Sequence, residues 1–180
     1  LGINIEMGWF YGVFLLFILI GASNAVNLTD GLDGLAGGLS AIAFIAFSLI
    51  SIAVGFEEIG IFSFILTGAL MGFLIFNTHP AKIFMGDTGS LALGAVMAAV
   101  AILTHREVTL LVVASVFVIE TLSVILQVVW LRLFKHKLFL MTPLHHHFEK
   151  LGWEETDIVK LFWVVGLILT MAGIFFGVWL

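Results

Sequence analysis

Six long apolar stretches are the feature that most limits what this chain can fold into. They cover residues 9–26, 35–54, 60–76, 90–103, 109–133 and 158–180. Most approach the length of about 20 residues that a helix needs to cross a bilayer. Hydrophobic residues make up 62% of the chain and charged residues only 11%, whereas a soluble domain carries about 25% charged residues. The stretches are continuous and do not alternate as barrel strands would. We therefore predict an all-α, polytopic membrane helix bundle that forms one integral domain over residues 1–180.

The predicted connections divide between the two sides of the membrane. Residues 27–34, 77–87 and 132–157 lie on one side, and residues 55–58, 104–108 and both chain ends lie on the other. Six of the seven basic residues fall on the first side or at its edge: Lys82, Arg132, Lys135, Lys137, Lys150 and Lys160. Only Arg106 lies on the second side. Because basic loops stay in the cytoplasm, we expect the first side, including the loop 132–157, to be cytoplasmic.

The composition also excludes several classes of protein. The net charge of -5 gives no support to nucleic-acid binding, which usually needs a basic face. The chain has no cysteine, which excludes disulfides and thiolate metal sites. No basic segment precedes a short apolar run after Leu1, so we expect no signal peptide and a further part of the protein upstream.

The first polar motif, NAVNLTDGLDGLAGG, begins at Asn24 near the end of the first apolar stretch. Asn24, Asn27, Asp30 and Asp33 recur every three residues, which at helical spacing predicts one polar stripe. Two carboxylates at this spacing attract a divalent cation or the hydrogen-bond donors of a ligand. The alternative is that Asp30 or Asp33 only caps the next helix.

The second motif, NTHPAKIFMGDTGSLALG, begins at Asn77. Pro80 should end the third helix, and Asp87 precedes the fourth, where the helix dipole favours an acid. This position also suits a Mg²⁺ ligand, because Mg²⁺ takes one or two carboxylates together with substrate phosphates. Lys82 offers a positive charge to the same phosphates, and Phe84 offers a ring that can stack on a base.

The third motif, MTPLHHHFEKLGWEE, places His145, His146 and His147 in the largest predicted loop. A zinc site is one interpretation, although zinc usually takes ligands at helix or strand spacing. An imidazole cluster that contacts phosphate is another, because histidine titrates near neutral pH. The third interpretation is a solvated loop with no functional role. The intramembrane Glu120 is a functional candidate by position, but we favour a role for Glu120 and Gln127 in holding helices together.

The three motifs together resemble those of the MraY family, the phospho-N-acetylmuramoyl-pentapeptide transferases, and they occur in the same order. The resemblance extends from Trp9 to the end of the chain. The first two motifs also resemble the wider superfamily of polyprenyl-phosphate N-acetylhexosamine-1-phosphate transferases, whereas PLHHHFE is specific to the MraY branch. Family members have ten transmembrane helices, of which this chain would supply the last six.

The resemblance implies an enzyme of peptidoglycan synthesis in the bacterial inner membrane, on which cell shape and division depend. It would transfer phospho-N-acetylmuramoyl-pentapeptide from UDP-MurNAc-pentapeptide to undecaprenyl phosphate, giving lipid I and UMP. The resemblance also implies Mg²⁺ as cofactor, surrounding membrane lipids, and a homodimer. By similarity the site residues are Asp30, Asp33 and Asp87 as catalytic residues, Asp87 as the metal ligand, and Asn27, Asn77, Phe84, His145, His146 and His147 as substrate-binding residues. Lys82 joins the substrate-binding set because of its charge.

One feature of the family is missing from this sequence. Family members carry two adjacent aspartates followed by a lysine, and no two aspartates are adjacent in these 180 residues. We expect the pair to lie upstream and this chain alone to be inactive. Rival interpretations are an intramembrane aspartyl protease, a transporter with polar groups near the midplane, a non-catalytic relative, and a WecA-like transferase of another UDP-N-acetylhexosamine.

Overall fold

The computed structural model describes residues 8–179, and within that range its regular structure is α-helical throughout. The helices are α1 Phe10–Thr29, α2 Leu35–Ala53, α3 Glu57–Asn77, α4 Gly86–Leu103, α5 Glu107–Val113, α6 Ser115–Phe134, α7 Leu144–Lys150 and α8 Glu155–Trp179. Six of them are long and apolar enough to cross a membrane, namely α1, α2, α3, α4, α6 and α8. The predicted all-α membrane bundle is therefore confirmed.

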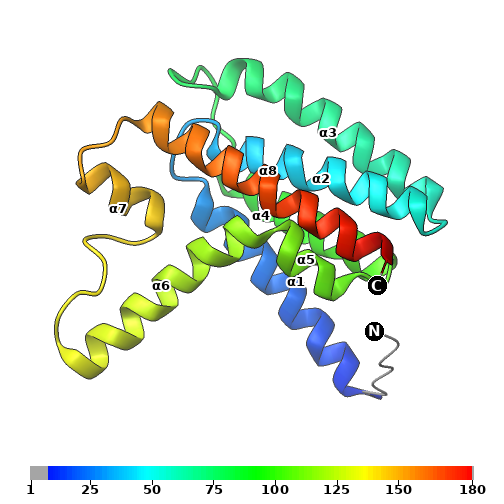
Figure 1. Ribbon diagram of the computed structural model, residues 1–180, viewed down its shortest axis with the longest axis horizontal. Helices are drawn as coiled ribbons and strands as arrows, with labels where there is room; N and C mark the ends of the chain where they lie inside the picture. Colours follow the sequence, from blue (N-terminus) through cyan, green and yellow to red (C-terminus); the bar gives the residue numbers. More distant parts are fainter. Residues whose placement is uncertain (1–7, 180) are drawn as a thin grey trace.

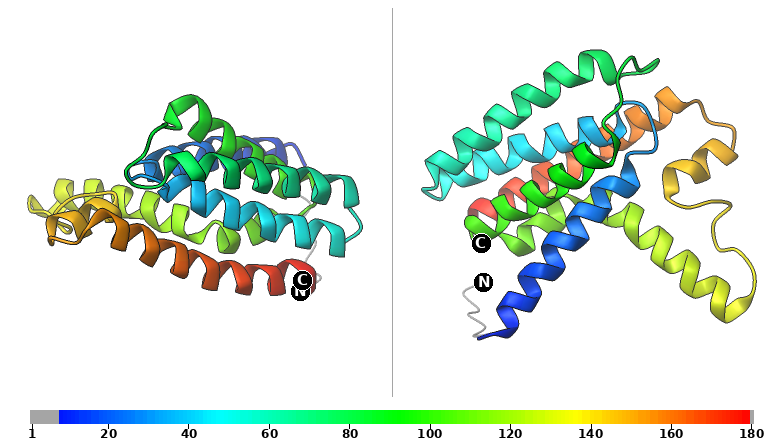
Figure 2. Two further views of the ribbon diagram at one scale, coloured as in Figure 1. Left: turned by 90° about the horizontal axis from the view of Figure 1, so that it is seen from above. Right: turned by 180° about the vertical axis from the view of Figure 1, so that it is seen from behind.

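Helix α2 lies at the centre of the bundle (Figure 1). Of its apolar window, 78% is buried, against 17% to 33% for the other five long helices. Helix α2 packs against α3 and α8, while α1 packs against α4 and α6. Helices α1 and α6 diverge from the centre, and α7 lies between α6 and the start of α8 (Figures 1 and 2). Helix α2 is thus mostly enclosed by protein, and the outer helices present apolar side chains to lipid.

The predicted fifth span, residues 109–133, is not one helix. It bends at Ala114, whose backbone angles are φ -96° and ψ 22°, and this bend separates α5 from α6. The sequence contains no proline or glycine there, so the cause is tertiary. The hydroxyl of Thr170 in α8 donates to the carbonyl oxygen of Val113 at 3.0 Å. Gly173 allows α8 to approach the backbone of Val113, which draws α5 toward α8 while α6 diverges.

The close approach of α1 and α4 places two of the polar motifs side by side. A Cβ atom on Gly94 would lie 2.3 Å from the carbonyl oxygen of Ala22, so only glycine permits this contact. Small residues at helix interfaces in membranes allow backbones to touch in this way. The end of α1 and the start of α4 consequently lie together.

The predicted loop 132–157 is only partly a loop, because it contains α7 and the start of α8. Gln127 of α6 fastens its first half. The Gln127 Oε1 atom accepts hydrogen bonds from the amides of Leu138 at 3.0 Å and Phe139 at 2.9 Å. Its Nε2 atom donates to the Phe139 carbonyl oxygen at 3.0 Å. Gln127 therefore holds this connection against α6 and does not join two spanning helices.

Candidate active site at one end of the bundle

Asn27 and Asp87 meet where α1 ends and α4 begins. The Asn27 Nδ2 atom donates to Asp87 Oδ1 at 3.1 Å and to Ser90 Oγ at 2.9 Å. Ser90 is fully buried and donates in turn to the carbonyl oxygen of Gly86. Asp87 itself is exposed, in the first turn of α4. Asn27 and Ser90 thus orient a carboxylate that remains open to a ligand.

Asp30 lies near enough to Asp87 for the two charges to interact. Burial, together with the negative charge of Asp87, raises the pKa of Asp30 from 3.8 to about 6. The negative charges of the two carboxylates repel each other near the positive N-terminal end of α4. A cation bound between them would offset this repulsion.

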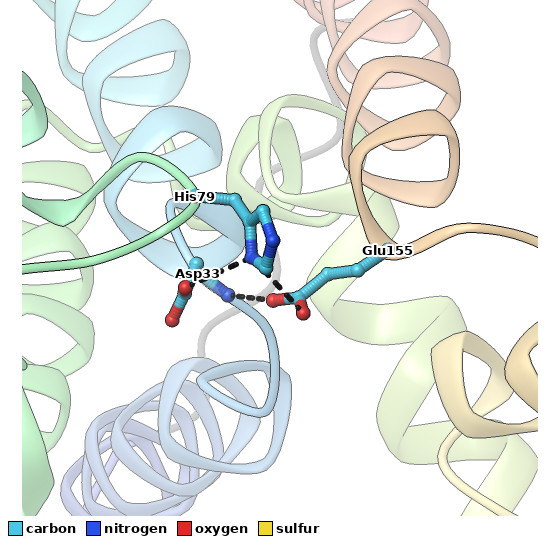
Figure 3. Close-up of side chains that lie close together, drawn as sticks. All are labelled: Asp33, His79 and Glu155. Carbon is cyan, nitrogen blue, oxygen red and sulfur yellow. Dashed lines mark hydrogen bonds and ion pairs between the residues drawn. The ribbon is translucent and has the colours of Figure 1, made fainter.

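Asp33 lies in a second cluster that joins three segments far apart in the sequence (Figure 3). The Asp33 Oδ2 atom lies 3.2 Å from His79 Nδ1 and accepts a hydrogen bond from the amide of Ala81 at 2.9 Å. His79 Nδ1 also lies 3.4 Å from Glu155 Oε2. The amide of Asp33 donates to Glu155 Oε1 at 2.7 Å. These contacts tie the α1–α2 turn to the α3–α4 loop and to α8.

The predicted polar stripe is wrong in its second half. Helix α1 ends at Thr29, with Asp30 as its C-cap residue, so Asp33 does not follow Asn27 on one helix face. Asp30 interacts with the charge of Asp87, whereas Asp33 contacts His79 and Glu155. The alternative of a simple cap also fails, because α2 has Gly34 at its N-cap, with φ 79°, and no side-chain cap.

The residues predicted to form a substrate pocket on the α3–α4 loop differ in their environments. Phe84 is 77% exposed, and Lys82 is exposed as well, so both can reach a ligand. Asn77 is buried and bonds only to backbone: its Oδ1 accepts from Gly34 at 3.1 Å and its Nδ2 donates to the Ile83 carbonyl at 3.0 Å. Asn77 therefore shapes the loop that carries Lys82 and Phe84.

The three adjacent histidines point in different directions. His145 is fully buried beside Glu120. His146 pairs with Glu149, and His147 Nδ1 accepts a hydrogen bond from the Leu140 amide at 3.1 Å. The predicted contact with substrate fits the partly exposed His146 and His147 better than it fits His145.

His79 and Glu155 were not among the predicted site residues, although both lie inside the quoted motifs. His79 directly precedes Pro80, and Glu155 ends the third motif. They lie 46 and 122 residues from Asp33 in the chain, so no local sequence spacing could pair them with it. The signal available was only that each stands in a polar segment at the same end of the bundle.

Two groups of side chains could hold a metal ion. One group is formed by Asp33, His79 and Glu155, whose potential ligand atoms all lie within 4.8 Å of one another. It is the only such group of three or more residues within residues 8–179. This set includes an imidazole, whose Nδ1 atom already lies within 3.4 Å of an oxygen of each carboxylate. Mg²⁺ prefers oxygen ligands and keeps positions for phosphate. The two carboxylates of Asp30 and Asp87, which interact through their charges, match that preference better.

Comparison with known proteins identifies the class. Residues 1–105 match the model of glycosyl transferase family 4, and the chain belongs to this family. A phospho-N-acetylmuramoyl-pentapeptide-transferase from Shouchella clausii is 55% identical over 97% of this chain. Transferases of the same name from Geobacillus thermodenitrificans and Bacillus velezensis are 55% and 53% identical over 98% and 99% of the chain.

The chain spans about half the length of these curated relatives, 54% of the Shouchella protein and 55% of the other two. Its relatives are bacterial, and six of its helices are suited to cross a membrane. The chain thus belongs to a bacterial membrane protein of glycosyl transferase family 4.

Proposed function

We propose that the protein containing this chain transfers phospho-N-acetylmuramoyl-pentapeptide from UDP-MurNAc-pentapeptide to undecaprenyl phosphate. An oxygen of the lipid phosphate would attack the sugar-linked phosphorus of the nucleotide. The bond from that phosphorus to UMP would break, and the products would be lipid I and UMP. This reaction would supply peptidoglycan synthesis, on which cell shape and division depend.

The observation that carries the proposal is the identity of 53% to 55% with transferases of this name over nearly the whole chain. The geometry supports it, because at one end of the bundle Asn27 bonds to Asp87 and the charge of Asp87 acts on Asp30. A site at a membrane surface can receive a water-soluble nucleotide and a lipid acceptor together. A protease with both acids inside the membrane, or a transporter with a midplane site, would need another arrangement.

Asp87 and Asp30 would hold Mg²⁺, and Asn27 would keep the Asp87 carboxylate in place. When bound, the ion supplies positive charge that neutralises the phosphates. Because undecaprenyl phosphate is mostly ionised at pH 7, the attacking oxygen needs no strong base. The main demand on the protein is therefore positioning and charge stabilisation.

The exposed side chains around this pair would bind the substrates. Lys82 would meet phosphate oxygens, and Phe84 would stack on the uracil ring. His146 and His147 would donate hydrogen bonds from the opposite side of the site. Asp33, held by His79 and Ala81, would keep the α1–α2 turn in position beside the nucleotide. Asn77 would hold the same turn through its hydrogen bond with the amide of Gly34.

We also propose that this end of the bundle faces the cytoplasm. Lys82, Lys135 and Lys137 lie in its loops, whereas Arg106 lies at the opposite end between α4 and α5. The bias follows the positive-inside rule. A cytoplasmic site would match a nucleotide donor made inside the cell. The homodimer that the resemblance implies is a separate expectation, to be tested by the mass of the purified protein in detergent.

The test is to assay the purified full-length protein with labelled UDP-MurNAc-pentapeptide, undecaprenyl phosphate and Mg²⁺. We expect a labelled lipid and an equal amount of UMP, and loss of both when Mg²⁺ is removed with EDTA. A parallel reaction with UDP-N-acetylglucosamine tests the WecA-like alternative. A lipid product from that nucleotide alone, or no product from either, would overturn the proposal.

A further inference from the structure

The imidazole of His145 is the most unusual buried group near the proposed site. Its side chain is 0% exposed, and within residues 8–179 neither ring nitrogen has a hydrogen-bond partner. A buried polar group without a partner costs stability, so such a group calls for an explanation.

On one edge of the ring lies Glu120 of α6, which is also fully buried. The Glu120 carboxyl group accepts hydrogen bonds from the amides of Leu144 at 2.6 Å and His145 at 3.2 Å, which fixes the first turn of α7. His145 Nδ1 lies 3.3 Å from Glu120 Oε1, without the angle of a hydrogen bond. Glu120 therefore fixes the backbone where His145 stands, and its carboxyl group lies against one edge of the ring.

On the other edge of the ring lies Gly31. A Cβ atom on Gly31 would lie 2.4 Å from His145 Nε2 and 3.2 Å from two ring carbons. Gly31 does not have a positive φ, so its backbone would accept alanine. The imidazole is thus the obstacle to a side chain at position 31, and it touches the turn next to Asp30.

We propose that His145 is a positioning residue: oriented by Glu120, its imidazole braces the turn at Gly31 and so sets the place of Asp30 opposite Asp87. The proposal rests on the transferase function proposed above, in which Asp30 and Asp87 form the site. His145 would then act without touching substrate. This role explains why a polar ring is buried between α6, α7 and the α1–α2 turn.

The experiment is a double-mutant cycle in the full-length protein with Gly31→Ala, His145→Ala and the combined variant. Gly31→Ala alone forces the methyl group against the ring, and His145→Ala alone removes the brace. Each should lower kcat by about 100-fold, the loss that a displacement of about 1 Å can cause, with KM for the nucleotide within about threefold. In the combined variant the methyl group occupies the space of the ring, so kcat should exceed that of Gly31→Ala. Gly68→Ala, where a Cβ meets nothing within 4 Å, is the matched control.

Two conservative variants separate positioning at Gly31 from a role confined to the Glu120 pair. Glutamine places an amide at the Nε2 position and reaches Gly31, whereas asparagine places one at the Nδ1 position and reaches only Glu120. The proposal expects His145→Gln to retain more kcat than His145→Asn. The opposite order would overturn it, even if His145→Ala does not fold.

The cycle is measured by thermal unfolding as well as by turnover, so the contact is tested without substrate. If the wild-type protein makes no lipid product, the proposed function fails, while the unfolding cycle still reports whether positions 31 and 145 are coupled. Strictly additive changes in Tm would refute the contact. A kcat for His145→Ala within about threefold of wild type would refute the positioning role.

Discussion

Replacing Asp30 with asparagine should stabilise the metal-free protein at neutral pH. Asparagine has nearly the same size but cannot ionise. It therefore removes the carboxyl group whose pKa burial and Asp87 raise to about 6. In the unfolded chain the same group ionises near 3.8. The folded state therefore binds the proton more tightly, and the free energy of unfolding falls as pH rises from about 4 to about 6.

The size of the effect follows from the gap between the two pKa values. The pKa rises from 3.8 to about 6, and each pKa unit corresponds to about 1.4 kcal/mol, giving about 3 kcal/mol for a fully shielded group. Asp30 is only partly buried, and water screening reduces this to roughly 1–2 kcal/mol. Asp30→Asn should recover that amount at pH 7.5 and nothing at pH 4. Each kcal/mol of stability corresponds to a shift in Tm of at most about 2–4 °C.

The assay is thermal unfolding of the full-length protein and of Asp30→Asn in detergent with EDTA, from pH 4 to pH 7.5. We expect the two Tm curves to coincide at low pH and to separate above pH 4, with the variant higher. Mg²⁺ added at pH 7.5 should raise Tm of the wild type more than that of the variant. Parallel Tm curves across the whole range would refute the electrostatic reasoning.

Three further changes have definite expected outcomes. Asp87→Asn should slow turnover about a thousandfold, close to 4 kcal/mol of barrier, with Tm within a few degrees of wild type; near-normal turnover would remove Asp87 from the metal site. Gly94→Leu should destabilise the protein by about 1–3 kcal/mol through overpacking against α1, whereas Gly68→Leu should leave Tm unchanged. Gln127→Ala should speed hydrogen exchange at the amides of Leu138 and Phe139, and unchanged exchange would show that other contacts hold this connection.

The spans could be predicted from the sequence because bilayer solvation acts on every residue of a helix in the same way. Local composition therefore suffices to find them, and each of the six predicted spans contains a helix long enough to cross a membrane, although the fifth is divided at Ala114. The bend at Ala114 could not be predicted, because its cause is a hydroxyl group on α8 more than fifty residues away. Helix α7 was missed for a similar reason. A helix of seven residues is too short to be stable alone, and its first turn depends on Glu120.

The candidate site shows the same division. Asn27, Asp30 and Asp87 were predicted from motifs, and the structure brings them together. The helical register that was expected to include Asp33 fails, because α1 ends at Thr29. Spacing along a chain predicts neighbours only while the helix continues. Tertiary contacts decide the rest, which is why the pairing of Asp33 with His79 and Glu155 was not foreseen.

The enclosure of α2 has a consequence for how the bilayer can influence this protein. Lipid thickness and fluidity act on the surfaces that lipids touch, and α2 offers few of these, mainly at Ile45, Leu49 and Ile52. Its N-terminus at Gly34 nevertheless receives the side chain of Asn77 and the indole of Trp163. The helix that anchors the α1–α2 turn is therefore largely shielded, and a change in the surrounding membrane acts on the site mainly by tilting α1, α3 or α8.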